Sequence, residues 1–174
     1  MSDLAAQVSA NVEGIVTALS QRDPSEPAPL HDGQPLTVGL LGGLWLNELV
    51  IHTVDLARAL RASFAIPESA AVLGVGAALA VSPYLLRSGK PNQARIEIRV
   101  RGIGAVVYDI EGDDMALVGA ISSVDAHVSA DPVTMLATSY GRTSQMAAIA
   151  SGRLRMWGRR WWRLSALTTR FSSA

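Results

Sequence analysis

The sequence predicts an α+β protein, and three observations lead to this class. Apolar residues recur at three- and four-residue steps through the first half of the 174-residue chain, which is typical of helices. After residue 91 the period changes to two, because Ala94, Ile96 and Ile98 alternate with charged residues. A connection at 88–91, which contains Gly89 and Pro91, separates the two patterns. We therefore expect a partial helical bundle over 1–89 and a small antiparallel sheet with helices over 90–174.

Three helices are expected in the first region. Apolar positions between Leu4 and Leu19 form one stripe, and the four prolines of 23–35 then predict an exposed connection. The second helix begins near Thr37 and is apolar over more than half of its circumference, so it must pack on several sides. A third helix is expected over 69–86. Two other helices cannot cover so wide an apolar surface, so we expect a homo-oligomer, most simply a dimer.

The second region is expected to start with a hairpin of strands 94–100 and 105–111, followed by strands 115–121 and 124–130. Asp131 and Pro132 are a typical N-cap and first helical residue, which predicts a helix over 133–140 that ends at Gly141. The remaining chain predicts a helix over 144–151, a strand over 153–157 and a helix over 160–171.

Composition excludes several classes of protein. The chain has no cysteine, which rules out disulfides, thiolate metal sites and a cysteine nucleophile. Its longest apolar run, 70–81, is shorter than a membrane span, and no secretory signal is recognisable, so we expect a cytoplasmic protein without a transmembrane segment. All 15 acidic residues precede position 132, whereas 132–174 holds seven arginines. The two ends of the chain therefore differ in charge.

Glu48 and His52 are spaced as metal ligands on the second predicted helix. Residues four apart lie on one face of a helix, and Asp55 follows on the same stripe. A carboxylate and an imidazole one turn apart can both reach a divalent ion. The alternative is that the two side chains hydrogen-bond each other or the backbone. Because the helix is otherwise apolar, we expect both side chains to face an interior groove.

The segment 47–60, NELVIHTVDLARAL, resembles the signature E-L-V-x-H-x-x-D-L-A-x-A-L of the mycothiol-dependent maleylpyruvate isomerase family. The resemblance implies a DinB-like metal-binding helical part, in which Glu48, His52 and a histidine from an earlier helix hold a divalent metal, usually zinc. Asp55 would orient the imidazole or contact a helix. The sequence departs from the family because only His31 precedes the motif, in the proline-rich connection, so the metal site is either degenerate or completed by another chain.

The second half is similar to the C-terminal domain of the same family. The similarity rests on VDAHVSADP at 124–132, Leu136, Tyr140-Gly141-Arg142 and Ala150-Ser151-Gly152, and it implies a fold like sterol carrier protein type 2. The family uses a C-terminal arginine near a dicarboxylate substrate. Arg142 is our candidate for this catalytic role, Arg153 and Arg155 are alternatives, and the simpler interpretation of Arg142 is a helix cap.

These resemblances imply two classes of function. In the first, a metal lowers the pKa of the sulfur of mycothiol, a cosubstrate, and the protein is an isomerase or transferase for a small molecule. In the second, the protein is a non-catalytic carrier of an apolar, sterol- or lipid-like ligand, or an oligomeric binding protein. We expect an apolar pocket between the two regions. The carrier needs no metal, and the sequence leaves open whether the protein is an enzyme.

Two further features have simpler interpretations. His127 alternates outward on a strand, which favours a solvated surface histidine. The segment 153–163 mixes five arginines with three tryptophans. We expect Trp157, Trp161 and Leu164 to cover the sheet, while the arginines form a solvated face. Contact with a membrane surface or with nucleic acid is the alternative for this segment, and nucleic acid is not among the expected partners.

Overall fold

The α+β class is confirmed by a computed structural model, which describes residues 2–29, 35–84, 93–119 and 123–165. Its first part contains α1 (Ser2–Ser20), β1 (Pro27–Pro29), β2 (Pro35–Thr37), α2 (Val38–Ala59), α3 (Glu68–Val81) and the 3-10 helix η2 (Ser82–Tyr84). Its second part contains β3 (Gln93–Val100), β4 (Gly104–Glu111), β5 (Asp114–Val118), β6 (Ala126–Ala130), α4 (Pro132–Ser139), α5 (Gln145–Ala150), β7 (Leu154–Trp157) and the 3-10 helix η3 (Trp161–Leu164).

The second part is built on a five-stranded sheet of order β5-β4-β3-β6-β7. The strand pairs β3–β4, β4–β5 and β6–β7 are antiparallel, as expected. β6, however, lies on the other side of β3 from β4 and runs parallel to β3. The sheet is therefore mixed: three of its four strand pairs are antiparallel, as expected, and the pair β3–β6 is not. Periodicity shows that a segment is a strand, but it does not show the direction of its neighbour.

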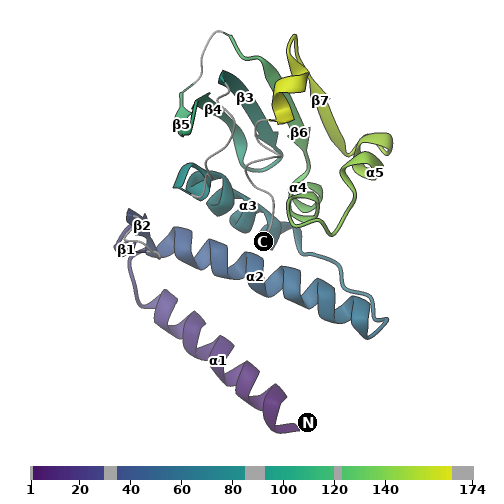
Figure 1. The fold of residues 1–174 in the computed structure, drawn as a ribbon. Coiled ribbons are helices and arrows are strands. Elements are labelled where there is room, and N and C mark those ends of the chain that lie inside the picture. Colours follow the sequence, from purple (N-terminus) through teal and green to yellow (C-terminus); the bar gives the residue numbers. More distant parts are fainter. Residues whose placement is uncertain (1, 30–34, 85–92, 120–122, 166–174) are drawn as a thin grey trace.

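One hydrophobic core joins the helices to the sheet. Ile96, Tyr108 and Ile110 on the inner sheet face belong to the same buried cluster as Ile51 of α2 and Val75 of α3. In Figure 1, α3 and α4 lie along one side of the sheet, and α2 lies beyond them. The core therefore contains residues of both regions that the change of period separates near residue 90.

Local capping chemistry places two helix starts where the sequence predicts them. The Thr37 side chain accepts a hydrogen bond from the Leu40 amide at the start of α2, and Asp131 does the same for Thr134 at the start of α4. Two elements differ from expectation. The proline-rich connection contains the short antiparallel pair β1–β2, and the helix expected over 160–171 is the 3-10 helix η3 within the described residues, with 166–171 outside them.

The first helix stands largely apart from the rest of the chain (Figure 1). Part of its apolar stripe, expected to be buried, is open to solvent: Leu4 is 67% exposed and Val16 is 54% exposed, whereas Leu19 is half-buried beside α2. Within the described residues, the exposed part of the stripe therefore lacks the partner that its sequence predicts. No helix in the described part of the chain combines the length and the apolar character needed to cross a bilayer.

Candidate functional site

Four residues singled out by the sequence lie together at the side of α2. Glu48, His52 and Asp55 project from consecutive turns of this helix, and Arg142 reaches Asp55 from the loop after α4. The Oε2 atom of Glu48 lies 3.5 Å from Nε2 of His52, and Oδ2 of Asp55 lies 4.0 Å from Nδ1 of the same imidazole. The imidazole is thus flanked by two carboxylates, one at each ring nitrogen.

The expectation that Glu48 and His52 face an interior groove is wrong. Their side chains are 57% and 72% exposed. On α2 the buried residues Asn47, Val50 and Ile51 face the core, and at 100° per residue the stripe of Glu48 and His52 lies about 125° away around the helix. Solvent therefore reaches both side chains.

Arg142 connects the end of α4 to α2. Its Nε and Nη2 atoms donate to the two carboxylate oxygens of Asp55, both at 2.6 Å, and Nη1 donates to the Tyr140 carbonyl at 2.6 Å. These hydrogen bonds to Arg142 hold the pKa of Asp55 below its usual value and raise the pKa of Arg142. The bond to the Tyr140 carbonyl matches the helix-cap interpretation. Arg58 also donates to the Arg142 carbonyl, which fixes the loop against α2.

Tyr140 is a site residue whose role the sequence does not reveal. Its hydroxyl donates to Oε1 of Glu48 at 3.3 Å. Burial, and then the nearby charge of Glu48, raise the pKa of Tyr140 to about 12. Tyr140 therefore stays a hydrogen-bond donor throughout the neutral range. The Tyr140-Gly141-Arg142 motif places Tyr140 next to Arg142. Its contact with Glu48 joins residues 92 positions apart, so no local sequence pattern predicts it.

The geometry of Glu48 and His52 fits two donors of a divalent metal. Two ligands at about 2.1 Å from a tetrahedral ion are about 3.4 Å apart, which is close to the observed 3.5 Å. Asp55 is not available as a third donor because Arg142 engages both of its oxygens. Within the described residues, no group of three or more histidine, aspartate or glutamate side chains forms a metal site. His31 lies outside the described residues.

The other arginine candidates do not join this cluster. Arg153 and Arg155 line a pocket at the end of β3 and β7 together with Arg99 and Arg101, and no residue of α2 contributes to it. The apolar pocket expected between the two regions is therefore not this one. His127 is less solvated than expected, since its side chain is 23% exposed, stacks on Trp157 and lies 3.2 Å from Oε1 of Glu97.

No protein-family model and no curated protein matches the sequence. Solved structures with a similar chain include a sec-alkyl sulfatase, with 10% identity over 55% of this chain and a TM-score of 0.48; this chain spans only 16% of the sulfatase. They also include sterol carrier protein 2-like domains. A ubiquinone synthesis protein, UbiJ-SCP2, shares 20% identity over 55% of this chain and 93% of its own, with a TM-score of 0.38. Sterol carrier protein 2 like 2 from Aedes aegypti shares 14% identity over 57% of this chain and 95% of its own, with a TM-score of 0.37.

Proposed function

We propose that Glu48 and His52 provide two ligands of a divalent-metal site for thiol-dependent isomerase or transferase chemistry, the class that the resemblance to the mycothiol-dependent family implies. The observation that carries the proposal is the 3.5 Å separation of Glu48 Oε2 and His52 Nε2 on one exposed turn of α2. Both donors reach solvent, so an ion or a thiol can approach them without opening the core.

The surrounding residues would orient the two ligands. Tyr140 donates to one oxygen of Glu48, which leaves the other oxygen facing His52. Asp55 lies on the side of the other ring nitrogen of His52, at 4.0 Å from Nδ1, so Nε2 is the nitrogen that faces Glu48 and would bind a metal. Arg142 keeps Asp55 ionised and in place. When bound, zinc would supply the lowered pKa that makes a mycothiol sulfur nucleophilic at neutral pH.

Arg142 still has N–H donors that could bind an anionic substrate. A guanidinium carries five N–H donors, and three of them are used by Asp55 and the Tyr140 carbonyl. The remaining donors would bind a substrate carboxylate beside the Glu48–His52 pair. This is the catalytic role that the sequence suggests for Arg142, and it coexists with the structural role already described.

The proposal is tested by zinc binding followed by activity. We expect isothermal titration with Zn²⁺ to show saturable binding that His52→Ala abolishes and that Tyr140→Phe weakens about 10-fold. His127→Ala is the matched control, because it removes an imidazole outside the cluster. Zinc-loaded protein is then mixed with mycothiol and maleylpyruvate, and the isomerisation is followed by ultraviolet absorbance. Zinc binding that His52→Ala and Glu48→Gln leave unchanged would contradict the assignment of these two ligands.

A second candidate function is a carrier of an apolar ligand. The observation in its favour is the set of exposed large apolar side chains on α2, just after it and on α3, which includes Leu56, Leu60 and Leu73 at 60%, 68% and 64% exposure. The test is displacement of a fluorescent fatty acid in the presence of a chelator. Binding that needs no metal and survives His52→Ala would favour the carrier, whereas zinc-dependent turnover would favour the enzyme.

A further inference from the structure

Three tryptophans near the C-terminal end of the described chain are largely exposed. Trp157, Trp161 and Trp162 are 43%, 59% and 57% exposed. The expectation that Trp157 and Trp161 cover the sheet is therefore wrong. The reason is that 154–157 is an edge strand and 161–164 is a single 3-10 turn, so the helical spacing on which the expectation depended does not exist. Only Leu164 of this turn is buried.

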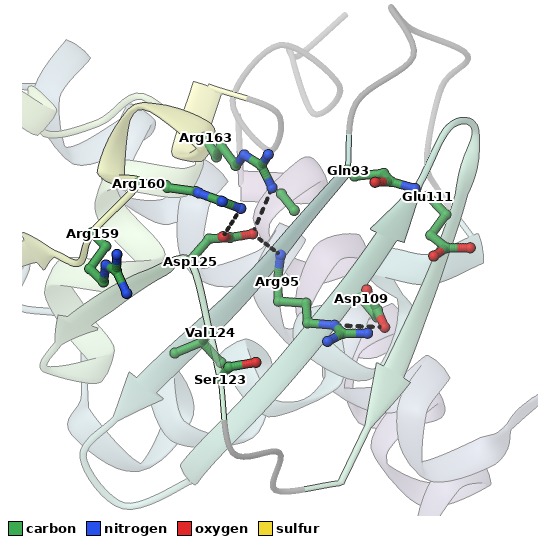
Figure 2. Close-up of a pocket in the computed structure, with 11 residues that line it drawn as sticks. Gln93, Arg95, Asp109, Glu111, Ser123, Val124, Asp125, Arg159, Arg160 and Arg163 are labelled. Atoms are coloured by element: carbon green, nitrogen blue, oxygen red, sulfur yellow. Dashed lines mark hydrogen bonds and ion pairs between the residues drawn. The ribbon is translucent and has the colours of Figure 1, made fainter.

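Asp125 holds η3 and its tryptophans in a fixed position. Its carboxylate oxygens pair with Arg160 at 3.2 Å and Arg163 at 2.9 Å, and its carbonyl accepts the Arg160 amide at 3.0 Å. Figure 2 shows the carboxylate of Asp125 joined to both guanidinium groups, with Arg159 to one side. The carboxylate is further fixed by the Arg95 amide at 3.0 Å. Trp161 and Trp162 thus project from an anchored turn rather than from a free tail.

Arginines without a carboxylate partner among the described residues lie in the same segment of the chain as these tryptophans. Within the described residues, no carboxylate lies within ion-pair distance of Arg153, Arg155 or Arg159. The chain from 132 to 165 contains no acidic residue. Asp125 pairs with Arg160 and Arg163, whereas Arg153, Arg155 and Arg159 have no carboxylate partner among the described residues. We call the exposed set the β7–η3 surface; it consists of Arg153, Arg155, Trp157, Arg159, Trp161 and Trp162.

We propose that the β7–η3 surface docks the protein on an anionic lipid bilayer. Indole rings favour the boundary between headgroups and acyl chains, where an apolar ring and a polar N–H are both accommodated. Arginines beside them are attracted to anionic headgroups, each strengthening binding about five-fold. The charge of the surface and its exposed aromatic area are complementary to such a membrane. The proposal does not depend on the metal site.

Single-stranded nucleic acid is less well matched to the same surface. Proteins that bind single strands stack successive bases on the faces of neighbouring aromatic rings. One face of Trp157 is covered by His127, since the two rings stack at 5.0 Å with an 8° angle between their planes. Trp161 and Trp162 are neighbours in a 3-10 helix, so their side chains leave the helix about 120° apart. Rings in these directions cannot stack on consecutive bases, but they can both enter a lipid headgroup layer.

The experiment is vesicle cosedimentation of the full chain, with tryptophan emission as a second readout. The probes are vesicles of phosphatidylcholine alone and of phosphatidylcholine with phosphatidylserine. We expect binding to the anionic vesicles with a blue-shifted emission, and weaker binding as salt rises. Arg155→Glu is expected to reduce the partition coefficient about five-fold or more. Arg61→Glu, which reverses an exposed charge after α2, is the matched control and is expected to change it less than two-fold.

Several results would overturn the proposal. The first is wild-type protein that does not sediment with the anionic vesicles, and the second is equal binding to both kinds of vesicle. The third is a Trp161→Ala, Trp162→Ala double variant that keeps its native circular dichroism and binds the anionic vesicles as tightly as wild type. Tighter binding to single-stranded oligothymidine than to the vesicles, measured by fluorescence anisotropy, would assign the surface to nucleic acid instead.

Discussion

Arg142 binds both carboxylate oxygens of Asp55 at 2.6 Å, across 87 positions of sequence. Asp55 belongs to the motif that follows Glu48 and His52 on α2, and Arg142 belongs to the Tyr-Gly-Arg motif after α4. The two motifs of the candidate site are therefore in direct contact. The bidentate geometry restricts the relative orientation of the two groups, because two parallel N–H···O bonds keep the guanidinium and the carboxylate close to one plane.

The first prediction concerns this pair. Arg142→Ala removes the only described side-chain donor to Asp55 and also leaves the Tyr140 carbonyl without its guanidinium bond. We expect a lower Tm than for wild type, measured by calorimetry at neutral pH. Arg22→Ala is the control, because Arg22 pairs with Glu26 on an exposed local segment and should change the Tm less. An equal or larger effect of Arg22→Ala would mean that the Asp55–Arg142 pair contributes nothing beyond a surface ion pair.

The same pair predicts a pH dependence of definite sign. Arg142 lowers the pKa of Asp55 in the folded protein, so the unfolded state binds more protons at acidic pH. The stabilisation is present above the usual aspartate pKa of about 4 and is lost as the pH falls through the lowered value. The difference in unfolding free energy between wild type and Asp55→Asn should therefore shrink as the pH falls below about 4. A difference that stays constant from neutral to strongly acidic pH would contradict this assignment.

The contact between α2 and α3 predicts opposite effects at two glycines. A Cβ atom at Gly74 would lie 1.8 Å from Oδ1 of the fully buried Asn47, whose Nδ2 donates to the Gly74 carbonyl at 2.8 Å. Gly74→Ala should therefore lower the unfolding free energy by about 2 kcal/mol or more. Gly76 has no atom within 4 Å of such a Cβ, so Gly76→Ala should raise it by up to about 1 kcal/mol. Urea denaturation measures both changes, and equal effects at the two positions would show that the helices do not pack as described.

The parts of the structure that the sequence predicts depend on local chemistry. Thr37 and Asp131 cap their helices through bonds to residues three positions ahead, so their side chains alone reveal the helix starts. Glu48 and His52 are close because any helix brings residues four apart together. The α+β class follows from the change of period near residue 90.

The parts that the sequence does not predict depend on which surfaces meet. The exposure of Glu48 and His52 is decided by which stripe of α2 packs on α3, and a helix that is apolar over most of its circumference does not specify that stripe. The contact of Tyr140 with Glu48 joins residues 92 positions apart. Trp161 lies in the 3-10 helix η3 within the described residues, so its side chain does not follow the α-helical spacing on which the expectation depended.

Tyr108 predicts a loss of stability in alkaline solution. Its hydroxyl donates to the Leu79 carbonyl at 2.7 Å and accepts from the Ser82 hydroxyl at 2.8 Å, and burial raises the pKa of Tyr108 to about 12. An unfolded tyrosine ionises near pH 10, so stability should fall between about pH 10 and 12. Tyr108→Phe should cost about 1 kcal/mol at neutral pH and flatten this alkaline fall.

Tyr84→Phe is the control for this prediction, because the Tyr84 side chain is 46% exposed. Unfolding free energies from urea titrations at neutral pH and near pH 11 provide the comparison. The role assigned to Tyr108 would be wrong if Tyr84→Phe flattened the alkaline fall as much as Tyr108→Phe.

The open stripe of α1 predicts self-association. Val8 and Val16 are 52% and 54% exposed on the face that also carries Leu4. An amphipathic helix in a protein gains most of its stability when its apolar face packs against another surface. We expect wild type to sediment as a dimer at micromolar concentration. Val8→Asp places a charge in the stripe and should shift the protein to monomer, whereas Ala10→Asp, on the opposite side of the helix, should leave the dimer intact. A well-folded wild-type monomer at that concentration would show that the stripe is not a dimer interface, and a dimer that resists Val8→Asp would place the interface on another surface.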